Sequence, residues 1–504
     1  MHPLIRPVLA PATFALALAG ALATLSPPAG ATNTPPIAGP SAAATPAAER
    51  RSTLDDQQSV AVTIYNEQLA LIKDRRRVVL DGGASRLALR DVSAQMKPQT
   101  ALLRSLDDPR AFQVLEQNFD FDLLSPAKLL EKSVGRSVRL IGWNHASSTE
   151  TVETAQVLAA GDGGLVLQIG DRIETSVPGR IVFDSVPPNL RDRPTLVTEL
   201  HTALPGPRSV ELSYLSGGLS WQADYVAELG ADNRSLDLNG WVTLTNRSGT
   251  AYPNARLQLV AGDVNRVQEQ MRGALMEARV AMAPAAAPAP GMTQQALFEY
   301  HLYTLQRPTT LADNQTKQVA LLQAAGAPVR KELLLAGDAH YYGAQVGEIA
   351  RKLKVGVFVE FDNREAAGLG LPLPKGIVRV YQRDGDGRAQ FIGEDRIDHT
   401  PKNEKVRLRL GDAFDLTADK KQTDFRVRPQ PGRRDAYETA YEIVLRNAKA
   451  EAVTVTVREP VPGDWTMLQE SQRHAKVAAG TAQWQVSVPA GGSSTLSYRV
   501  LARY

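Results

Sequence analysis

Residues 211–260, ELSYLSGGLSWQADYVAELGADNRSLDLNGWVTLTNRSGTAYPNARLQLV, decide the fold of this chain. Leu212 and Tyr214 alternate with polar residues, and the same period of two returns in later runs that begin at Trp221 and Leu236. Clusters of Gly, Asn, Asp and Ser separate the runs. Apolar residues at every second position between such clusters are typical of half-buried antiparallel strands. The stretch therefore predicts a strand–turn–strand–turn–strand block at the centre of a β-sandwich.

The same signals on both sides of this block predict a mainly β chain of several units. Antiparallel, Ig-like sandwich units are expected at the centre and the C-terminus, with a small β-barrel-like module before them and a partly helical insertion within them. The predicted divisions are a signal peptide (1–31), a flexible Ala/Pro linker (32–58), an N-terminal β domain (59–124), a short helix with the barrel-like module (125–190), the first part of the central sandwich (191–262), the insertion (263–296), the second part of the central region (297–430) and a C-terminal Ig-like sandwich (431–504).

Local signals support several of these divisions. Ser125 followed by Pro126 is typical of the first residues of a helix, which should end at Gly135. Turns centred on Asn246 and Asn447 close two strands of similar character, one in the central block and one near the C-terminus. This similarity suggests two related Ig-like units in one chain.

The first 31 residues predict export. Arg6 precedes an Ala/Leu-rich apolar run from Val8 to Leu25, and Ala29-Gly30-Ala31 is a small-residue cleavage site. Prolines shorten the uninterrupted apolar part below the ~20 residues that a membrane-spanning helix needs. We therefore expect cleavage after Ala31, a mature chain without a transmembrane segment, and a periplasmic or extracellular location.

Composition excludes some kinds of chemistry. The chain has no cysteine, which removes disulfides, thiolate nucleophiles and cysteine-based zinc sites. Its 57 basic and 54 acidic residues are interspersed, so the charge gives no reason to expect nucleic acid or an anionic membrane as the partner. The mature length of 504 − 31 = 473 residues suits about three domains.

Several runs resemble a known family. They are GLSWQADY, GWVTLTNRSG, ARLQLVAGDV, YTLQRPTTLADNQTKQVALL, LPLPKGIVRVY, HTPKNEKVRLRLGDAFD and YEIVLRNAKAEAVTVTV, all within residues 197–504. A looser similarity begins at TIYNEQLALIKDRRRVVL, residues 63–80. These runs resemble the exported bacterial family called domain of unknown function 4139, some members of which carry a mucoidy-inhibitor label. The resemblance implies an exported, β-rich protein and assigns no activity to any residue.

Two charged runs are candidate sites near the N-terminus. Arg75-Arg76-Arg77 would suit a phosphate or lipid headgroup, but an exposed hairpin edge, where charge discourages pairing with another sheet, is the preferred interpretation. Phe119-Asp120-Phe121-Asp122 places two carboxylates two residues apart, where a cation or an acid/base pair is conceivable. A solvated strand face is the simpler interpretation of this second run.

The remaining motifs are weaker. His301, His340 and His399 lie far apart in sequence and lack metal-ligand spacing. Asp384-Gly385-Asp386-Gly387 fails the EF-hand pattern at Arg388 and predicts a hairpin turn. Met271 and Met276 lie at helical spacing in the predicted insertion, where they would contact a partner or the parent domain. The sequence thus nominates no catalytic, cofactor-binding or metal-binding residue.

Two functional hypotheses remain. The first is a non-enzymatic exported protein that binds another exported protein or a polymer of the cell envelope, through sheet edges or the helical insertion. It depends on the export signal, the β units and the missing catalytic signatures. The alternative is a carboxylate-dependent hydrolase acting on envelope glycan or peptide, because such enzymes need no linear motif. A cleft with two acids would favour the hydrolase, and acids spread singly would favour the binder.

Overall fold

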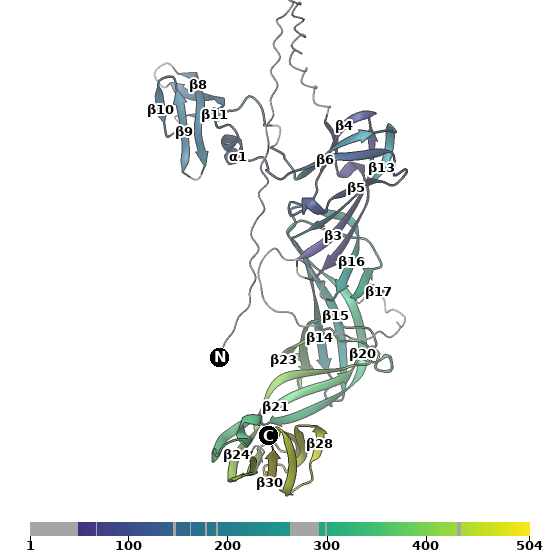
Figure 1. Cartoon of the computed structure of the whole chain (residues 1–504), viewed down its shortest axis with the longest axis vertical. Coiled ribbons are helices and arrows are strands. Elements are labelled where there is room, and N and C mark those ends of the chain that lie inside the picture. Colours follow the sequence, from purple (N-terminus) through teal and green to yellow (C-terminus); the bar gives the residue numbers. More distant parts are fainter. Residues whose placement is uncertain are drawn as a thin grey trace, which may run out of the picture. The chain divides into compact units, whose positions relative to one another are not determined.

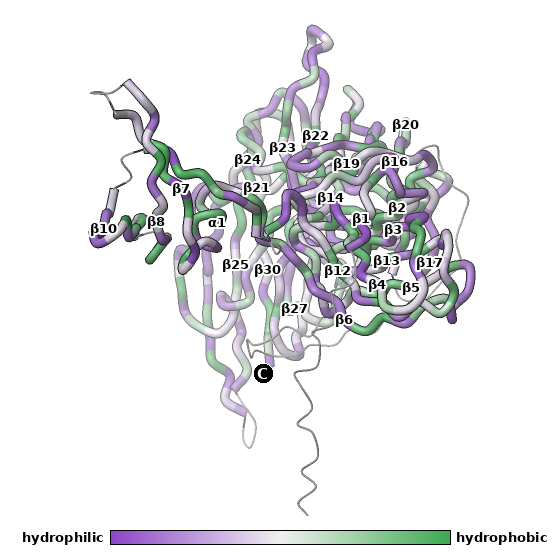
Figure 2. The backbone as a smooth tube through the Cα atoms, turned by 90° about the horizontal axis from the view of Figure 1, so that it is seen from above, coloured by the Kyte–Doolittle hydropathy of each residue, from purple (hydrophilic) through white to green (hydrophobic). Residues whose placement is uncertain are grey.

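Strands dominate the protein. The computed structural model describes residues 49–503, apart from residues 67, 145–147, 162, 177–178, 188–189, 263–291, 298–299 and 431–434. The described residues form sheets of four, five, eight and thirteen strands (Figure 1). Hydrophobic and hydrophilic residues alternate along the strands in Figure 2. The prediction of a mainly β chain is confirmed.

The central block forms four strands shared by two sheets: β13 (Gly206–Ser216), β14 (Leu219–Leu229), β15 (Ser235–Asn246) and β16 (Tyr252–Ala261). β13 and β16 belong to the eight-stranded sheet, and β14 and β15 to the thirteen-stranded sheet. Gly218 makes the turn between β13 and β14 at φ +75°, where a Cβ atom would lie 2.7 Å from the carbonyl oxygen of Arg247. Buried side chains of both sheets, Trp221 and Tyr225 among them, form one hydrophobic cluster, called here the first core.

Two sheets make up the N-terminal part. The eight-stranded sheet follows the order β17-β18-β16-β2-β3-β13-β5, with β19 beside β16. The four-stranded sheet follows the order β1-β4-β12-β6. Their further strands are β1 (Glu49–Ser52), β2 (Gln57–Tyr65), β3 (Leu69–Leu80), β4 (Gly83–Arg90), β5 (Leu102–Ser105), β6 (Phe112–Asp120), β12 (Thr195–Thr202), β17 (Met292–Leu297), β18 (Tyr300–Leu305) and β19 (Thr309–Leu311).

The segment predicted as a barrel-like module is an open sheet, so that prediction is wrong. Its order is β10-β9-β8-β7-β11, and the end strands β10 (Arg172–Glu174) and β11 (Arg180–Val182) are only three residues long and do not pair with each other. Closure requires each end strand to pair with the other. The inner strands are β7 (Ser137–Asn144), β8 (Thr149–Gly161) and β9 (Gly164–Ile169). The predicted helix is present as α1 (Pro126–Glu131), with Ser125 as its N-cap.

The thirteen-stranded sheet runs β23-β22-β14-β15-β20-β21-β24-β25-β30-β27, and β26, β29 and β28 branch from β20. Its remaining strands are β20 (Gln315–Ala336), β21 (Glu348–Asp362), β22 (Gly376–Arg383), β23 (Ala389–Ile397), β24 (Lys405–Arg428), β25 (Ala436–Asn447), β26 (Val453–Pro460), β27 (Asp464–Glu470), β28 (Ala475–Ala478), β29 (Thr481–Val488) and β30 (Ser493–Arg503). Four 3-10 helices complete the described elements: η1 (Leu54–Asp56), η2 (Pro98–Thr100), η3 (Ala339–Tyr342) and η4 (Glu365–Ala367).

Long strands connect two cores. β25 and β30 pack against β26 and β29 around a second hydrophobic cluster, called here the second core. β20, β21 and β24 contribute buried residues to both cores; in β24 these are Leu408 in the first and Leu416 in the second. Figure 1 shows β20 and β21 running side by side, and they pair from Val329 opposite Phe361. The C-terminal unit therefore shares strands with the central one.

Two buried asparagines perform the same task in the two units. Asn246 ends β15 and Asn447 ends β25, and each is 2% exposed. In both, the amide nitrogen donates to the carbonyl four residues later, at 2.9 Å and 2.7 Å respectively. Both also donate to two consecutive carbonyls of a distant segment, residues 311–312 and residues 488–489. The similarity of the two turns noted in the sequence extends to their hydrogen bonds.

Some predicted segments fall outside the described residues. These include residues 1–48, with the predicted signal peptide and most of the linker, and residues 263–291, with Met271 and Met276. β1, η1 and the start of β2 lie inside the predicted linker, and β17 begins inside the predicted insertion. No helix of the described ranges is both long enough and apolar enough to span a bilayer.

Candidate functional site

Two of the three arginines in the run Arg75-Arg76-Arg77 form ion pairs. Arg76 is 1% exposed and donates to Asp74 at 2.7 Å, and Arg75 donates to Glu211 at 2.7 Å. β3 lies between β2 and β13, so the prediction that this run guards an exposed hairpin edge is wrong. The sequence of one strand does not reveal which strands pair with it on either side, so a central strand can have the charges of an edge strand. Two of its three guanidinium groups therefore already have a carboxylate partner.

The acidic run after β6 is divided between two sets of cations. Asp120 accepts a hydrogen bond from Arg191 at 2.9 Å, whereas Asp122 pairs with Lys132 at 2.7 Å and with Lys128 at 3.7 Å. β6 ends at Asp120, so the two carboxylates do not share a strand face. The structure therefore does not combine them into an acid/base pair.

The histidines lie on separate elements. His301 is in β18 and contacts Gln294, His340 is in η3 and pairs with Asp338, and His399 follows β23. Among the described residues, no three His, Asp or Glu side chains form a group that could hold a metal ion. Residues 384–387 form the predicted hairpin turn between β22 and β23, in which Asp384 accepts from the backbone N–H groups of residues 386 and 388.

Several carboxyl groups have displaced pKa values. Each described carboxyl whose pKa is displaced lies below its ordinary value; Glu211, Glu360 and Glu438 are the most buried of them by side chain. Burial raises the pKa of Glu360, but the hydrogen bond from Arg330 and the nearby cations lower it by more. A glycosidase needs one carboxylic acid with a raised pKa to protonate the leaving group. These carboxyls instead serve in ion pairs.

A buried ion pair lies in the second core. Lys420 of β24 and Glu459 of β26 are 2% and 1% exposed, and their Nζ and Oε2 atoms are 2.6 Å apart. The hydroxyl of Tyr342 donates to Glu459 at 3.0 Å, and the hydroxyls of Tyr342 and Tyr498 are 2.9 Å apart. The ammonium group also lies 4.9 Å from the centre of the Tyr441 ring. Burial raises the pKa of both tyrosine hydroxyls, which keeps them protonated as donors.

Aromatic rings connect this pair to the surface. Tyr498 stacks on Trp484 with ring centroids 4.8 Å apart, and Trp484 lies 6.0 Å from the ring of His474. Glu470 accepts hydrogen bonds from the backbone N–H of His474 at 3.0 Å, from its Nδ1 at 2.9 Å and from Nε1 of Trp484 at 3.2 Å. The loop between β27 and β28 is therefore fixed to the core.

The strands on either side of this loop form the candidate site, which we call the corner: Trp465, Leu468, Glu470, His474, Lys476 and Val477. β27 pairs only with β30 and β28 only with β29, so among the described residues each has an unpaired edge. Each strand also carries a one-residue bulge, at Leu468 and at Val477. These bulged side chains are 48% and 51% exposed. Bulges redirect side chains, and here both place an aliphatic group in solvent.

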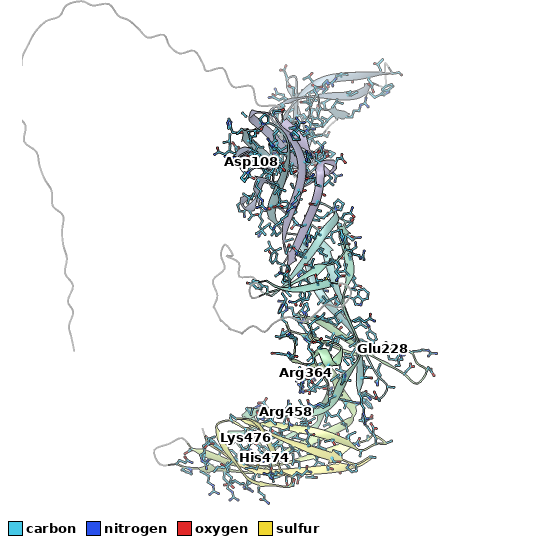
Figure 3. The ribbon with its side chains drawn as sticks, turned by 90° about the vertical axis from the view of Figure 1, so that its right-hand side faces the viewer. Asp108, Glu228, Arg364, Arg458, His474 and Lys476 are labelled. Atoms are coloured by element: carbon cyan, nitrogen blue, oxygen red, sulfur yellow. The ribbon has the colours of Figure 1, made fainter. Side chains whose placement is uncertain are left out.

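Aromatic and basic groups complete the corner. Trp465 is anchored by its Nε1, which donates to the carbonyl oxygen of Ala479 at 2.8 Å. Nζ of Lys476 lies 4.7 Å from the centre of its ring, and the His474 ring lies 5.4 Å from it. Figure 3 shows His474 and Lys476 together on the C-terminal strands. Trp465 itself is only 6% exposed, so the corner presents two exposed aliphatic side chains and the ammonium group of Lys476, which the buried ring helps to hold in place.

The C-terminal part of the chain, corner included, matches a known family. The model described as domain of unknown function (DUF4139) matches residues 210–504. The chain belongs to the DUF4139 family. No curated protein matches it. The DUF4139 region contains both asparagine turns, the buried ion pair and the corner, so these features lie within the part of the chain that defines the family.

The corner was missed in the sequence, although signals for it exist. In β27 the adjacent apolar residues Met467 and Leu468 break the period of two, which indicates a bulge. In the DUF4139 region the buried lysine also follows a pattern: Leu416, Ala418 and Lys420 occupy alternate positions of β24, so the lysine must face the core with the other two.

Proposed function

We propose that the protein is exported and binds a protein or a polymer of the cell envelope without catalysing a reaction. The observation that carries this proposal is the corner, where two bulges expose aliphatic side chains beside an anchored tryptophan. The apolar first 31 residues support export.

Side-chain contacts suit the corner better than strand addition. A partner strand would have to pair along β27 or β28, but the bulges at Leu468 and Val477 interrupt both edges, and β28 has only four residues. Bulges and short edge strands discourage such pairing. Complete burial of an aliphatic side chain contributes about 1.5–3 kcal/mol, so these half-exposed residues would contribute roughly 1 kcal/mol each on docking.

We also propose that the C-terminal unit is an Ig-like sandwich. Its two layers around the second core and its asparagine turn support this assignment, because the central unit repeats the turn with matching hydrogen bonds. In such sandwiches, loops and edges at the ends of the sheets are the surfaces available for recognition.

Co-sedimentation tests the proposal. Residues 32–504 would be mixed with purified envelope fractions, and the supernatant assayed for released sugars and peptides. We expect the protein to pellet without release, and Leu468→Asp/Val477→Asp to remain in the supernatant. Leu115→Asp is the matched control, since Leu115 is a bulged, 60% exposed leucine on the edge strand β6. Released fragments, or equal pelleting of the double variant, would show the proposal to be wrong.

A further inference from the structure

The five-stranded sheet has one covered face and one open face. Val138, Leu140, Ala155, Val157, Leu167 and Ile169 point to the covered face and form a hydrophobic cluster of their own. α1 contacts β8. The alternate residues of the same strands point the other way, and most of them are exposed; Ile141 and Val166 are half-buried. The module therefore buries its own core without using the open face.

The open face carries one large aromatic residue among polar and aliphatic side chains. Strand register places its members together: Arg139 opposite Thr154, Ile141 opposite Val152, Trp143 opposite Glu150, and Gln156 opposite Gln168. Trp143 is 54% exposed although it lies within β7. An exposed indole offers a flat apolar surface together with a hydrogen-bond donor.

The charges of this face cancel. Arg180 pairs with Glu150 at 3.0 Å, immediately beside Trp143, and Arg139 pairs with Asp184 at 2.7 Å. Both guanidinium groups have a carboxylate partner, so the face has no surplus cation to attract a polyanion. Glu150 and Arg180 keep acceptor and donor capacity toward solvent, since their side chains are 54% and 65% exposed.

We propose that this face binds an uncharged glycan chain, with one sugar ring stacked on Trp143. A pyranose ring presents an apolar C–H face and a rim of hydroxyl groups, and the face matches it with an indole bordered by a carboxylate and a guanidinium. Beyond the apolar pair of Ile141 and Val152, the hydroxyl of Thr154 and the amides of Gln156 and Gln168 add polar groups along the same face. From Trp143 to Ser137 the strand spans about 20 Å at roughly 3.3 Å per residue, enough for several sugar units.

Affinity electrophoresis tests this inference. Residues 32–504 would be run through native gels that contain dextran, mixed-linkage β-glucan, xylan or galactomannan as neutral polysaccharides, and alginate as a polyanion. We expect retardation by at least one neutral polysaccharide, at least tenfold weaker for Trp143→Ala and largely restored in Trp143→Phe. Trp241→Ala is the matched control, because Trp241 is 40% exposed on β15 of another sheet.

Three outcomes would overturn the inference: no retardation by any of the four neutral polysaccharides, retardation that Trp143→Ala leaves unchanged, or retardation by alginate alone. Circular dichroism and thermal melting establish that each variant is folded. The inference is independent of the corner, since Leu468→Asp/Val477→Asp should be retarded as strongly as the unmodified protein. Failure of one proposal thus leaves the other open to its own test.

Discussion

Replacing Glu459 with glutamine should strongly destabilise the protein. The substitution keeps the shape of the side chain but leaves the ammonium group of Lys420, 2% exposed, without a counter-charge. Removing one partner of a buried ion pair costs about 3–5 kcal/mol, because the remaining charge stays in a poorly polarisable environment. At about 1.4 kcal/mol per factor of ten, the ratio of folded to unfolded protein should fall by roughly two to three and a half orders of magnitude.

Urea unfolding of residues 32–504, followed by tryptophan fluorescence, measures this loss. We expect a lower midpoint for Glu459→Gln at an unchanged slope, which identifies a change in stability. Lys420→Met/Glu459→Leu should recover to within about 1 kcal/mol of the original, because apolar replacement of a buried pair is often neutral or stabilising. Glu394→Gln is the control. The Glu394 side chain is 51% exposed, and its ion pair with Arg379 should contribute at most about 1 kcal/mol to stability. A loss below about 1 kcal/mol for Glu459→Gln would refute the reasoning.

Three further changes can be measured in the same way. Asn447→Ala removes the donor to three carbonyls and should cost about 2–3 kcal/mol, since those groups are left buried. Gly337→Ala would place Cβ 2.0 Å from Oε2 of Glu459 and should cost about 1–3 kcal/mol of stability. The same substitution should cost less in a variant with a shorter side chain at position 459. The hydrogen bond from Arg191 lowers the pKa of Glu49 in the folded protein. The contribution of Glu49 to stability is therefore complete above pH 4.5, the ordinary pKa of this group, and is lost as the pH falls through the lower pKa of the folded state. The urea concentration at the midpoint of unfolding should therefore decrease when the pH is lowered below 4.5, and it should decrease less steeply for Glu49→Gln.

Local patterns were sufficient to predict the strands of the central block. Trp221 and Tyr225 occupy alternate positions and are buried, which is what a period of two implies. The sequence did not show that β13 and β14, separated by Gly217 and Gly218, belong to different sheets. That assignment depends on pairing with distant strands such as β3 and β22.

The candidate site was harder to predict for the same reason. The broken period at Met467 and Leu468 is a local signal of a bulge, but the position of the bulges at Leu468 and Val477 follows from the pairing of β27 with β30 and of β28 with β29. Nothing in the sequence around Trp143 shows that it is exposed, because the exposure of one face of a sheet depends on what packs on the other. Lys420 lies on the apolar face of β24, and its partner Glu459 is 39 residues away.

The strands that run through both cores make the molecule mechanically continuous. A force applied to the C-terminal strands is transmitted to the central unit along the covalent backbones of β20, β21 and β24. It does not have to cross a non-covalent interface that could separate. Shortened versions ending between residues 362 and 436 would therefore strip partners from strands that still belong to the first core, leaving open edges prone to aggregation. Under tension, such continuity would keep both units folded or release them together.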